Sequence, residues 1–226
     1  MNIYSKSDGS DLEIDKKETY RYLGYHFGGN IPPDPEIEKL VEELTSGIKT
    51  SSTPRCAFEI YDLILDNDCC FLYASDTICN SEVQKFKISD SITPLLQISS
   101  HKLSAHLADC HKAILFGATL GPGVDILIRR YSGRSTIKPA ILQAAGASAI
   151  EAFADEATEY MKKSLFSGDL PVFKMRFSPG YGDFSLEHQN DFFRLLNLER
   201  TLGLSLNSAL LMSPSKSITA IIGVSA

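Results

Sequence analysis

One short stretch of the chain combines a permanent positive charge with a rigid turn. It runs from Arg176 to Phe184 and reads Arg-Phe-Ser-Pro-Gly-Tyr-Gly-Asp-Phe. A guanidinium offers a planar fork of donors that matches a carboxylate, and the Pro179-Gly180 step imposes a turn. Such a turn beside a cation suits a small ligand that carries charge and hydrogen-bonding groups. The alternative for Arg176 is a structural salt bridge to a nearby acid such as Asp183, and the residues alone favour neither.

A second candidate group is the carboxylate of Glu151, which opens the run Glu-Ala-Phe-Ala in an alanine-rich segment. At helical spacing Glu151 shares a face with Ser148, Asp155 and Thr158. A face of this kind is typical of a helix surface in contact with solvent. From the residues alone we therefore expect Glu151 to lie on the surface.

The cysteines and histidines predict no metal centre. The cysteines are odd in number and contain no Cys-x-x-Cys pair, which argues against a disulfide framework or a structural zinc site. We expect buried, reduced thiols. Three of the histidines lie five residues apart and cannot share one helix face. The residues concerned are Cys56, Cys69, Cys70, Cys79 and Cys110, and His101, His106 and His111.

A glycine-rich stretch, Gly117 to Gly123, lies between a strand-like and a helix-like segment. This is the setting of a phosphate-binding loop. The glycine spacing matches no such motif, however, and Pro122 lacks an amide donor. We favour a strand-to-helix turn built for packing, with an unrelated nucleotide-binding enzyme as the distant alternative.

Composition places the chain among ordinary folded proteins. It has 226 residues, of which 43% are hydrophobic, and a formal net charge of −6. The negative charge and the lack of a basic stripe argue against nucleic-acid binding. No apolar run approaches the roughly 20 residues of a membrane span, and the polar residues 1–17 contain no secretory signal. We therefore expect a cytoplasmic protein that binds neither nucleic acid nor membrane.

The hydrophobic pattern predicts a single α+β domain over residues 1–226, with a mostly antiparallel, twisted sheet flanked by helices. Residues 1–17 form a polar lead-in. A helix begins after Asp34. The strands expected are 56–65, 70–74, 85–88, 113–120, 172–175, 205–211 and 217–223; the further helices are 101–110, 124–131, 135–165 (ended by Gly168) and 185–198.

Three segments resemble the activation domain of cobalamin-dependent methionine synthase. Arg176 and Pro179-Gly180-Tyr181 match the turn of that family, and the residues from Leu211 to Ala220 match its last loop and strand. The run that begins at Glu151 matches an alanine-rich helix of the family. A weaker resemblance, from about Glu13 to the C-terminus, is to small stand-alone forms of the domain.

The resemblance implies that the chain binds S-adenosylmethionine. Arg176 would hold the ligand's carboxylate, and Glu151 would accept from its amino group or ribose hydroxyls. Ser178, Gly180 and Tyr181 would supply main-chain contacts to the adenine and a ring for stacking, although Tyr181 fits a core aromatic equally well. No residue is expected to act as an acid or base.

The activity implied is an accessory one in methionine biosynthesis. The chain would act in trans in the reductive methylation of cob(II)alamin on a methionine synthase or a related corrinoid methyltransferase. The cobalamin would be carried by that partner, and an electron donor such as a flavodoxin-like protein would supply the electron.

The chain also departs from the family pattern. The loop that starts at Pro214 matches the family's proline-x-x-serine loop, but this alignment puts Ile222 where larger members carry a pocket-lining tyrosine. The family's N-terminal aspartate has no match among Asp11, Asp15 and Asp34. The alternative is therefore a non-catalytic docking or adaptor module that keeps the fold and has lost S-adenosylmethionine binding.

Overall fold

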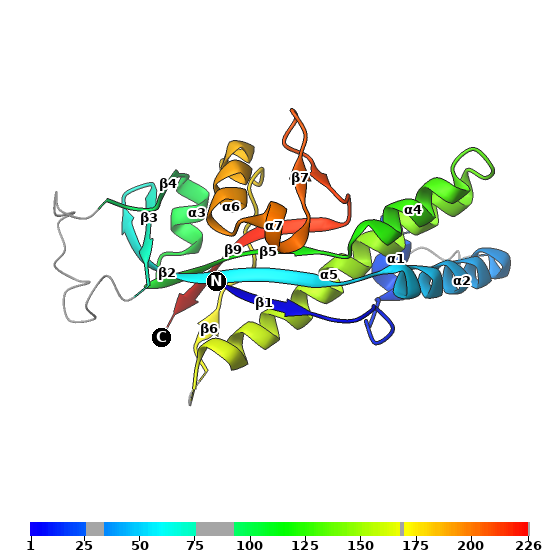
Figure 1. The fold of residues 1–226 in the computed structure, drawn as a ribbon, viewed down its shortest axis with the longest axis horizontal. Coiled ribbons are helices and arrows are strands. Elements are labelled where there is room, and N and C mark those ends of the chain that lie inside the picture. The colour runs from blue at the N-terminus through cyan, green and yellow to red at the C-terminus, as the bar shows by residue number, and fades with distance from the viewer. Residues whose placement is uncertain (26–33, 76–92, 168–169, 226) are drawn as a thin grey trace.

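The structure is a computed structural model that describes residues 1–25, 34–75, 93–167 and 170–225. Its centre is an antiparallel sheet in the strand order β4-β3-β2-β5-β9-β6, with β1 paired to β2 on the edge shared with β3 (Figure 1). A separate hairpin joins β7 and β8. The strands are β1 (Asn2–Ser5), β2 (Arg55–Asp66), β3 (Cys69–Ala74), β4 (Leu96–Ser99), β5 (Lys112–Thr119), β6 (Val172–Phe173), β7 (Ser205–Leu206), β8 (Met212–Ser213) and β9 (Ser217–Ser225).

Helices cover both faces of this sheet (Figure 1). One face carries α1 (Lys16–Tyr22), α2 (Pro35–Ser51), α4 (Pro122–Tyr131) and α5 (Ile137–Leu165); the other carries α3 (His101–His106), α6 (Gln189–Leu195) and α7 (Leu198–Leu202), and a short 3-10 helix, Leu186–His188, precedes α6. The predicted α+β class, with an antiparallel sheet flanked by helices, is confirmed. Over the described ranges, no helix is both long and apolar enough to cross a membrane.

The middle strands are apolar on both sides because both faces of the sheet are covered. In β5, Ile114 and Phe116 face the α5 layer, while Ala113 and Leu115 face the layer of α6 and α7. All four side chains are fully buried. Alternate residues of a strand point to opposite faces, so the run of apolar residues in β5 builds two cores at once.

Helix α5 packs closely on its neighbours through its small residues. A Cβ on Gly146 would lie 2.9 Å from Cε of Lys216, so the lysine stem packs directly over this glycine and would have to shift for any larger residue. The apolar residues of α5 that face the sheet are buried: Leu142, Ala149, Ile150, Phe153 and Met161. Tyr160 is 40% exposed instead and stacks on Tyr4 with ring centroids 4.3 Å apart.

Most predicted elements are present, and α2 begins at the Asp34 cap as expected. The strand predicted over 205–211 is wrong: only two residues are extended before a turn. Asn207 accepts from the amides of Ala209 and Leu211 in that turn, and Leu210 has a φ of 59°. The helix predicted over 185–198 breaks at Asn197, whose φ is 46°.

Two further elements are shorter than predicted. The helix predicted over 101–110 ends at His106, and the strand predicted over 172–175 pairs only at 172–173. The predicted strand 85–88 and the stop at Gly168 lie outside the described residues. That the chain forms one domain stays a prediction.

The polar lead-in is tied to the sheet and to α5. Strand β1 pairs with β2, and Lys6 contacts Glu156 of α5 and Asp11, each at 2.8 Å. Tyr4 donates to the same Glu156, and burial, with this hydrogen bond, raises the pKa of Tyr4 to about 12. These contacts bring residues 2–22 alongside the polar face of α5.

The glycine-rich loop between β5 and α4 packs against the end of α2. A Cβ on Gly123 would lie 2.0 Å from the backbone oxygen of Ser51, and Gly121 has a φ of 78° beside Thr53. Thr53 also donates its amide to the carbonyl of Leu120 at 2.8 Å. These contacts account for the glycines through packing.

We therefore predict that Gly123→Ala destabilises the protein by about 1–3 kcal/mol, because the new methyl group would meet backbone that cannot move aside. Gly47 in α2 is the matched control, since a Cβ there would meet only the Cδ2 of Leu127, at 3.3 Å. Thermal unfolding should show a lower midpoint for Gly123→Ala and little change for Gly47→Ala. Equal midpoints would contradict this account of the loop.

Asp183 anchors the turn that follows Arg176 to the start of α3. Its carboxylate accepts from Ser100 Oγ at 2.5 Å and from the His101 amide at 2.9 Å. The Ser100 hydrogen bond, helped by backbone amides including that of Lys102, holds the pKa of Asp183 below its ordinary value of 3.8. A carboxylate at the N-terminus of a helix is also favoured by the helix dipole.

A lowered pKa in the folded state means that Asp183 stabilises the fold above its ordinary pKa and loses this effect as the pH falls through the lowered value. We predict that Asp183→Asn lowers the unfolding midpoint at neutral pH. The difference from the wild type should narrow below about pH 4. Thermal unfolding across this range tests the prediction, and a gap that does not depend on pH would contradict it.

Candidate functional site

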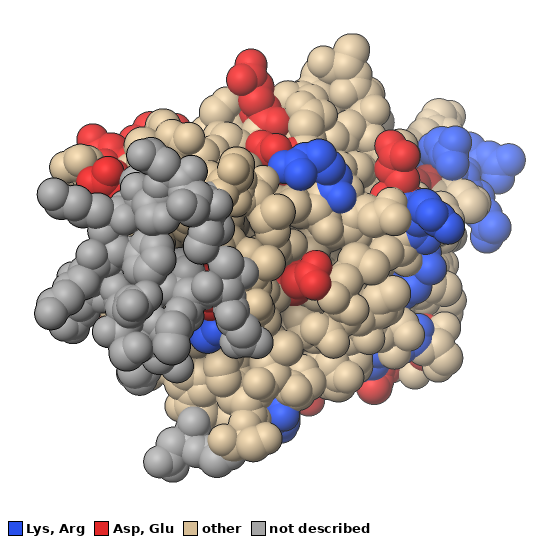
Figure 2. Space-filling view, turned by 60° about the vertical axis from the view of Figure 1, so that its left-hand side comes forward, with Lys and Arg blue, Asp and Glu red and all other residues tan. Residues whose placement is uncertain are grey.

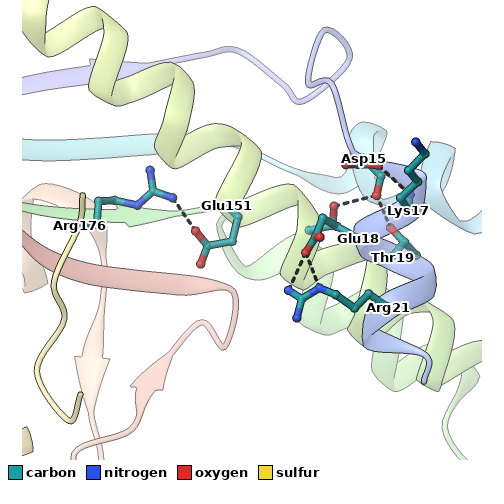
Figure 3. Close-up of polar contacts among 8 residues, drawn as sticks. Asp15, Lys17, Glu18, Thr19, Arg21, Glu151 and Arg176 are labelled. Carbon is teal, nitrogen blue, oxygen red and sulfur yellow. Dashed lines mark hydrogen bonds and ion pairs between the residues drawn. The ribbon is translucent and has the colours of Figure 1, made fainter. Parts of the chain in front are cut away.

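Arg176 is placed by the edge of the sheet. The segment after β6 continues along β9, where Phe177 and Ile221 exchange backbone hydrogen bonds of 3.0 and 2.9 Å. The side chain of Arg176 crosses to α5, where Nη2 donates to Glu151 at 2.6 Å and Nη1 to Asp155 at 2.5 Å. Figure 3 shows the guanidinium pointing at Glu151. The two predicted charged residues, 25 positions apart, therefore meet.

The salt bridge to Asp183 that we considered for Arg176 is not formed. Asp183 is held at the N-terminus of α3 instead. Arg176 is still an ion-paired residue, but its partners come from α5. The turn and the arginine thus have separate anchors, so the guanidinium is not needed to hold the turn.

The polar strip of α5 is only partly the open helix surface that its composition predicts: the side chains of Asp155 and Glu151 are 74% and 47% exposed, but Ser148 is not. Ser148 is buried and donates to the carbonyl of Asp15 at 3.1 Å. Glu151, Asp155 and Thr158 each line two adjoining hollows. The strip lies in a depression because the N-terminal segment runs beside it, a contact between residues far apart in the chain.

The larger depression, called here the acidic hollow, has a volume of about 740 Å³. Helix α5 forms one wall, and the lead-in with α1 forms the other (Figure 3). Its lining residues are Lys6, Asp11, Glu13, Asp15, Glu18, Tyr22, Ser148, Glu151, Ala152, Asp155, Glu156, Thr158 and Glu159.

The smaller depression, called here the arginine hollow, has a volume of about 400 Å³. It lies between α5 and the segment that contains β6 and Arg176. The lining residues are Glu151, Asp155, Thr158, Lys162, Phe173, Lys174, Met175, Arg176, Ser178 and Ile218. Because the hollows share three residues of α5, they adjoin along that helix and together form the candidate site, with the arginine hollow at its cationic end.

The two ends of this site differ in charge. The acidic hollow carries eight Asp and Glu side chains and one basic residue, Lys6. The arginine hollow carries Lys162, Lys174 and Arg176 beside its two acids. Elsewhere on the surface, Figure 2 shows Lys and Arg side chains gathered along one edge of the face it presents. The site therefore suits a ligand with a positive group at one end and a carboxylate at the other.

The turn residues fall into two groups. Ser178 lines the arginine hollow, whereas Gly180 and Tyr181 line neither hollow. The amide of Gly180 already donates to the carbonyl of Phe184 at 2.7 Å, and that of Tyr181 donates to Ser178 at 3.1 Å. Gly180 has a φ of 90°, which explains why glycine stands there.

Tyr181 is not a core aromatic, since its side chain is 69% exposed. Its ring meets Phe177 edge-on, with centroids 5.4 Å apart. A ring in this position offers a free face at the surface close to Arg176 in the chain.

The structure also shows where the residues that depart from the family pattern lie. Ile222 is fully buried in the core and lines neither hollow; Ile218 is the β9 residue that lines the arginine hollow. Asp11 and Asp15, neither of which matches the family's N-terminal aspartate in sequence, both line the acidic hollow. No local signal could have revealed them, because their proximity to α5 depends on how β1 and α1 pack.

The loop from Pro214 to Ser217 is held away from both hollows. Ser215 donates its amide to Asp125 of α4 at 2.7 Å. Lys216 runs over Gly146 and donates to the carbonyl of Gln143 at 3.1 Å. Burial lowers the pKa of Lys216. The loop therefore packs β9 against α4 and α5.

The described part of the chain contains no cluster of side chains suited to a metal ion. Among the described residues, no group of three or more His, Cys, Asp and Glu side chains is arranged to hold an ion. Cys56, Cys70 and Cys110 are buried, Cys69 is partly buried, and all four are free thiols. Cys79 lies outside the described residues.

Comparison with known proteins gives one informative result. No protein-family model and no curated protein sequence matches the chain. Among solved structures, the chain is similar to a crystal structure of the MetH reactivation domain bound to AdoHcy, with a TM-score of 0.68 and 14% sequence identity. The match covers 99% of this chain and 78% of the other. At this identity the similarity establishes a shared fold, that of the MetH reactivation domain.

Proposed function

We propose that the chain binds S-adenosylmethionine in the joined acidic and arginine hollows and serves the reductive methylation of cob(II)alamin on a partner protein. One observation carries the proposal: Arg176 and Glu151 meet at the junction of the two hollows. The fold supports it, because the solved domain of this fold was crystallised with AdoHcy, the demethylated form of the same ligand.

The residues present fit the groups of this ligand. The guanidinium of Arg176 can grip the α-carboxylate through paired hydrogen bonds. Glu151 can accept from the α-amino group or the ribose hydroxyls. The acidic hollow favours the positive sulfonium, and its volume of about 740 Å³ lies within the ordinary range of small-ligand sites.

Reduction of cobalt by one electron and transfer of the methyl group to it are chemistry that the partner's cobalamin supplies. The contribution of this chain is to bind the methyl donor and hold it in one orientation. Such a role needs no side-chain acid or base. We propose a separate corrinoid methyltransferase as the partner and a flavodoxin-like protein as the electron donor.

A docking or adaptor module is the second candidate, and two observations favour it. The Gly180 and Tyr181 amides are used within the turn, so they offer less to a ligand than expected. Met175, which lines the arginine hollow, and Tyr181, which lines neither hollow, are 82% and 69% exposed. Large exposed apolar side chains of this kind are available for contact with a partner protein.

Substitution of Arg176 tests the binding site. Calorimetric titration with S-adenosylhomocysteine and S-adenosylmethionine should show one saturable site in the wild type. Arg176→Ala should weaken binding by about 10- to 100-fold, since hydrogen bonds to charged groups contribute roughly 1.5–3 kcal/mol. Arg176→Lys should also weaken it, because lysine keeps the charge and loses the planar fork.

The matched control is Arg129→Ala, which removes an exposed arginine at the end of α4, outside both hollows. This variant should bind as the wild type does, and circular dichroism should show all three variants folded. Unchanged affinity in Arg176→Ala would reject the site.

Methyl transfer tests the activity. With cob(II)alamin on a corrinoid protein, a one-electron donor and S-adenosylmethionine, addition of the chain should convert the cob(II)alamin spectrum to that of methylcobalamin. One S-adenosylhomocysteine should form per methyl group transferred, and Arg176→Ala should suppress both signals. If the chain binds the corrinoid protein but neither binds S-adenosylmethionine nor supports methylation, the docking module is the better account of its function.

A further inference from the structure

Arg176 carries one positive charge but forms ion pairs with two carboxylates, those of Glu151 and Asp155. Glu151 and Asp155 lie four residues apart on α5, so both side chains reach the same guanidinium. Their contacts are 2.6 and 2.5 Å long and use Nη2 and Nη1, the two outer nitrogens of the fork. The cluster of three side chains therefore carries a net charge of −1 at the position where the proposed ligand's carboxylate must bind.

The α-amino-acid end of the ligand carries one charge of each sign. If Arg176 takes the carboxylate and one acid takes the ammonium group, the four charges balance. The remaining acid is then surplus: it competes with the ligand for the guanidinium and repels the ligand's carboxylate.

The exposure of the two acids identifies the surplus one. The side chain of Asp155 is 74% exposed, against 47% for Glu151. Within the described residues, Asp155 has Arg176 as its one ion-pair or hydrogen-bond partner through its side chain. An exposed carboxylate loses little on release to water, so Asp155 is the acid that a ligand can displace at least cost.

We propose that Asp155 is an internal competitor that limits the affinity of the site for ligands with a carboxylate, and so sets its discrimination between ligands. This inference rests on the proposed function. It gives the two acids on Arg176 opposite roles: Glu151 assists binding, and Asp155 opposes it.

The test is the affinity of Asp155→Asn for two ligands. S-adenosylhomocysteine has the amino-acid end and no sulfonium charge, whereas 5′-methylthioadenosine lacks that end altogether. Asp155→Asn should bind S-adenosylhomocysteine about two- to five-fold more tightly, in line with the strength of an exposed ion pair. It should bind 5′-methylthioadenosine as the wild type does, and the gain should shrink at high salt.

Glu151→Gln is the matched variant, because Glu151 lies one helical turn from Asp155 and contacts the same guanidinium. It should bind S-adenosylhomocysteine more weakly than the wild type. Weaker or equal binding by Asp155→Asn, or an equal gain for 5′-methylthioadenosine, would overturn the role given to Asp155. If the wild type binds neither ligand, or Arg176→Ala binds as well as the wild type, the proposed function fails and this inference fails with it.

Discussion

The structure depends on the antiparallel pairing of β5 between β2 and β9. These strands are covered on both faces, so their side chains fill two cores that pack different sets of helices. The same pairing sets the edge of the sheet along which Phe177 meets Ile221. Helix α5 lies over one face of these strands, and Arg176 leaves the edge beside it. The approach of Arg176 to Glu151 is therefore a consequence of the sheet.

The site is assembled from three segments that are far apart in the chain. The lead-in with α1 and the polar strip of α5 enclose the acidic hollow, and the segment after β6 closes the cationic end. Lys6 ties the first of these to Glu156 of α5. Each wall rests on backbone pairing or core packing, while the charged groups project from it. Rigid elements thus hold the groups that would contact a ligand.

The two acids that contact Arg176 contribute little to folding. Exposed ion pairs are worth about 0–1 kcal/mol, and the acids on Arg176 are both partly exposed. The turn has its own anchor in Asp183, which is held by the N-terminus of α3. Substitutions at Arg176, Glu151 and Asp155 can therefore change binding while the two cores stay intact. This separation makes the proposed function open to direct test.

The sequence by itself determined the elements whose pattern is local. Hydrophobic periodicity predicted the strands β2, β3 and β5, helix α4 and the long helix α5, and Pro179-Gly180 predicted the turn, because these signals depend on near neighbours in the chain. Only the tertiary structure decided the partner of Arg176, the burial of Ser148 and the positions of Asp11 and Asp15. Helical spacing identified the polar strip of α5 correctly. What covers that strip depends on packing between distant segments, about which local periodicity carries no information.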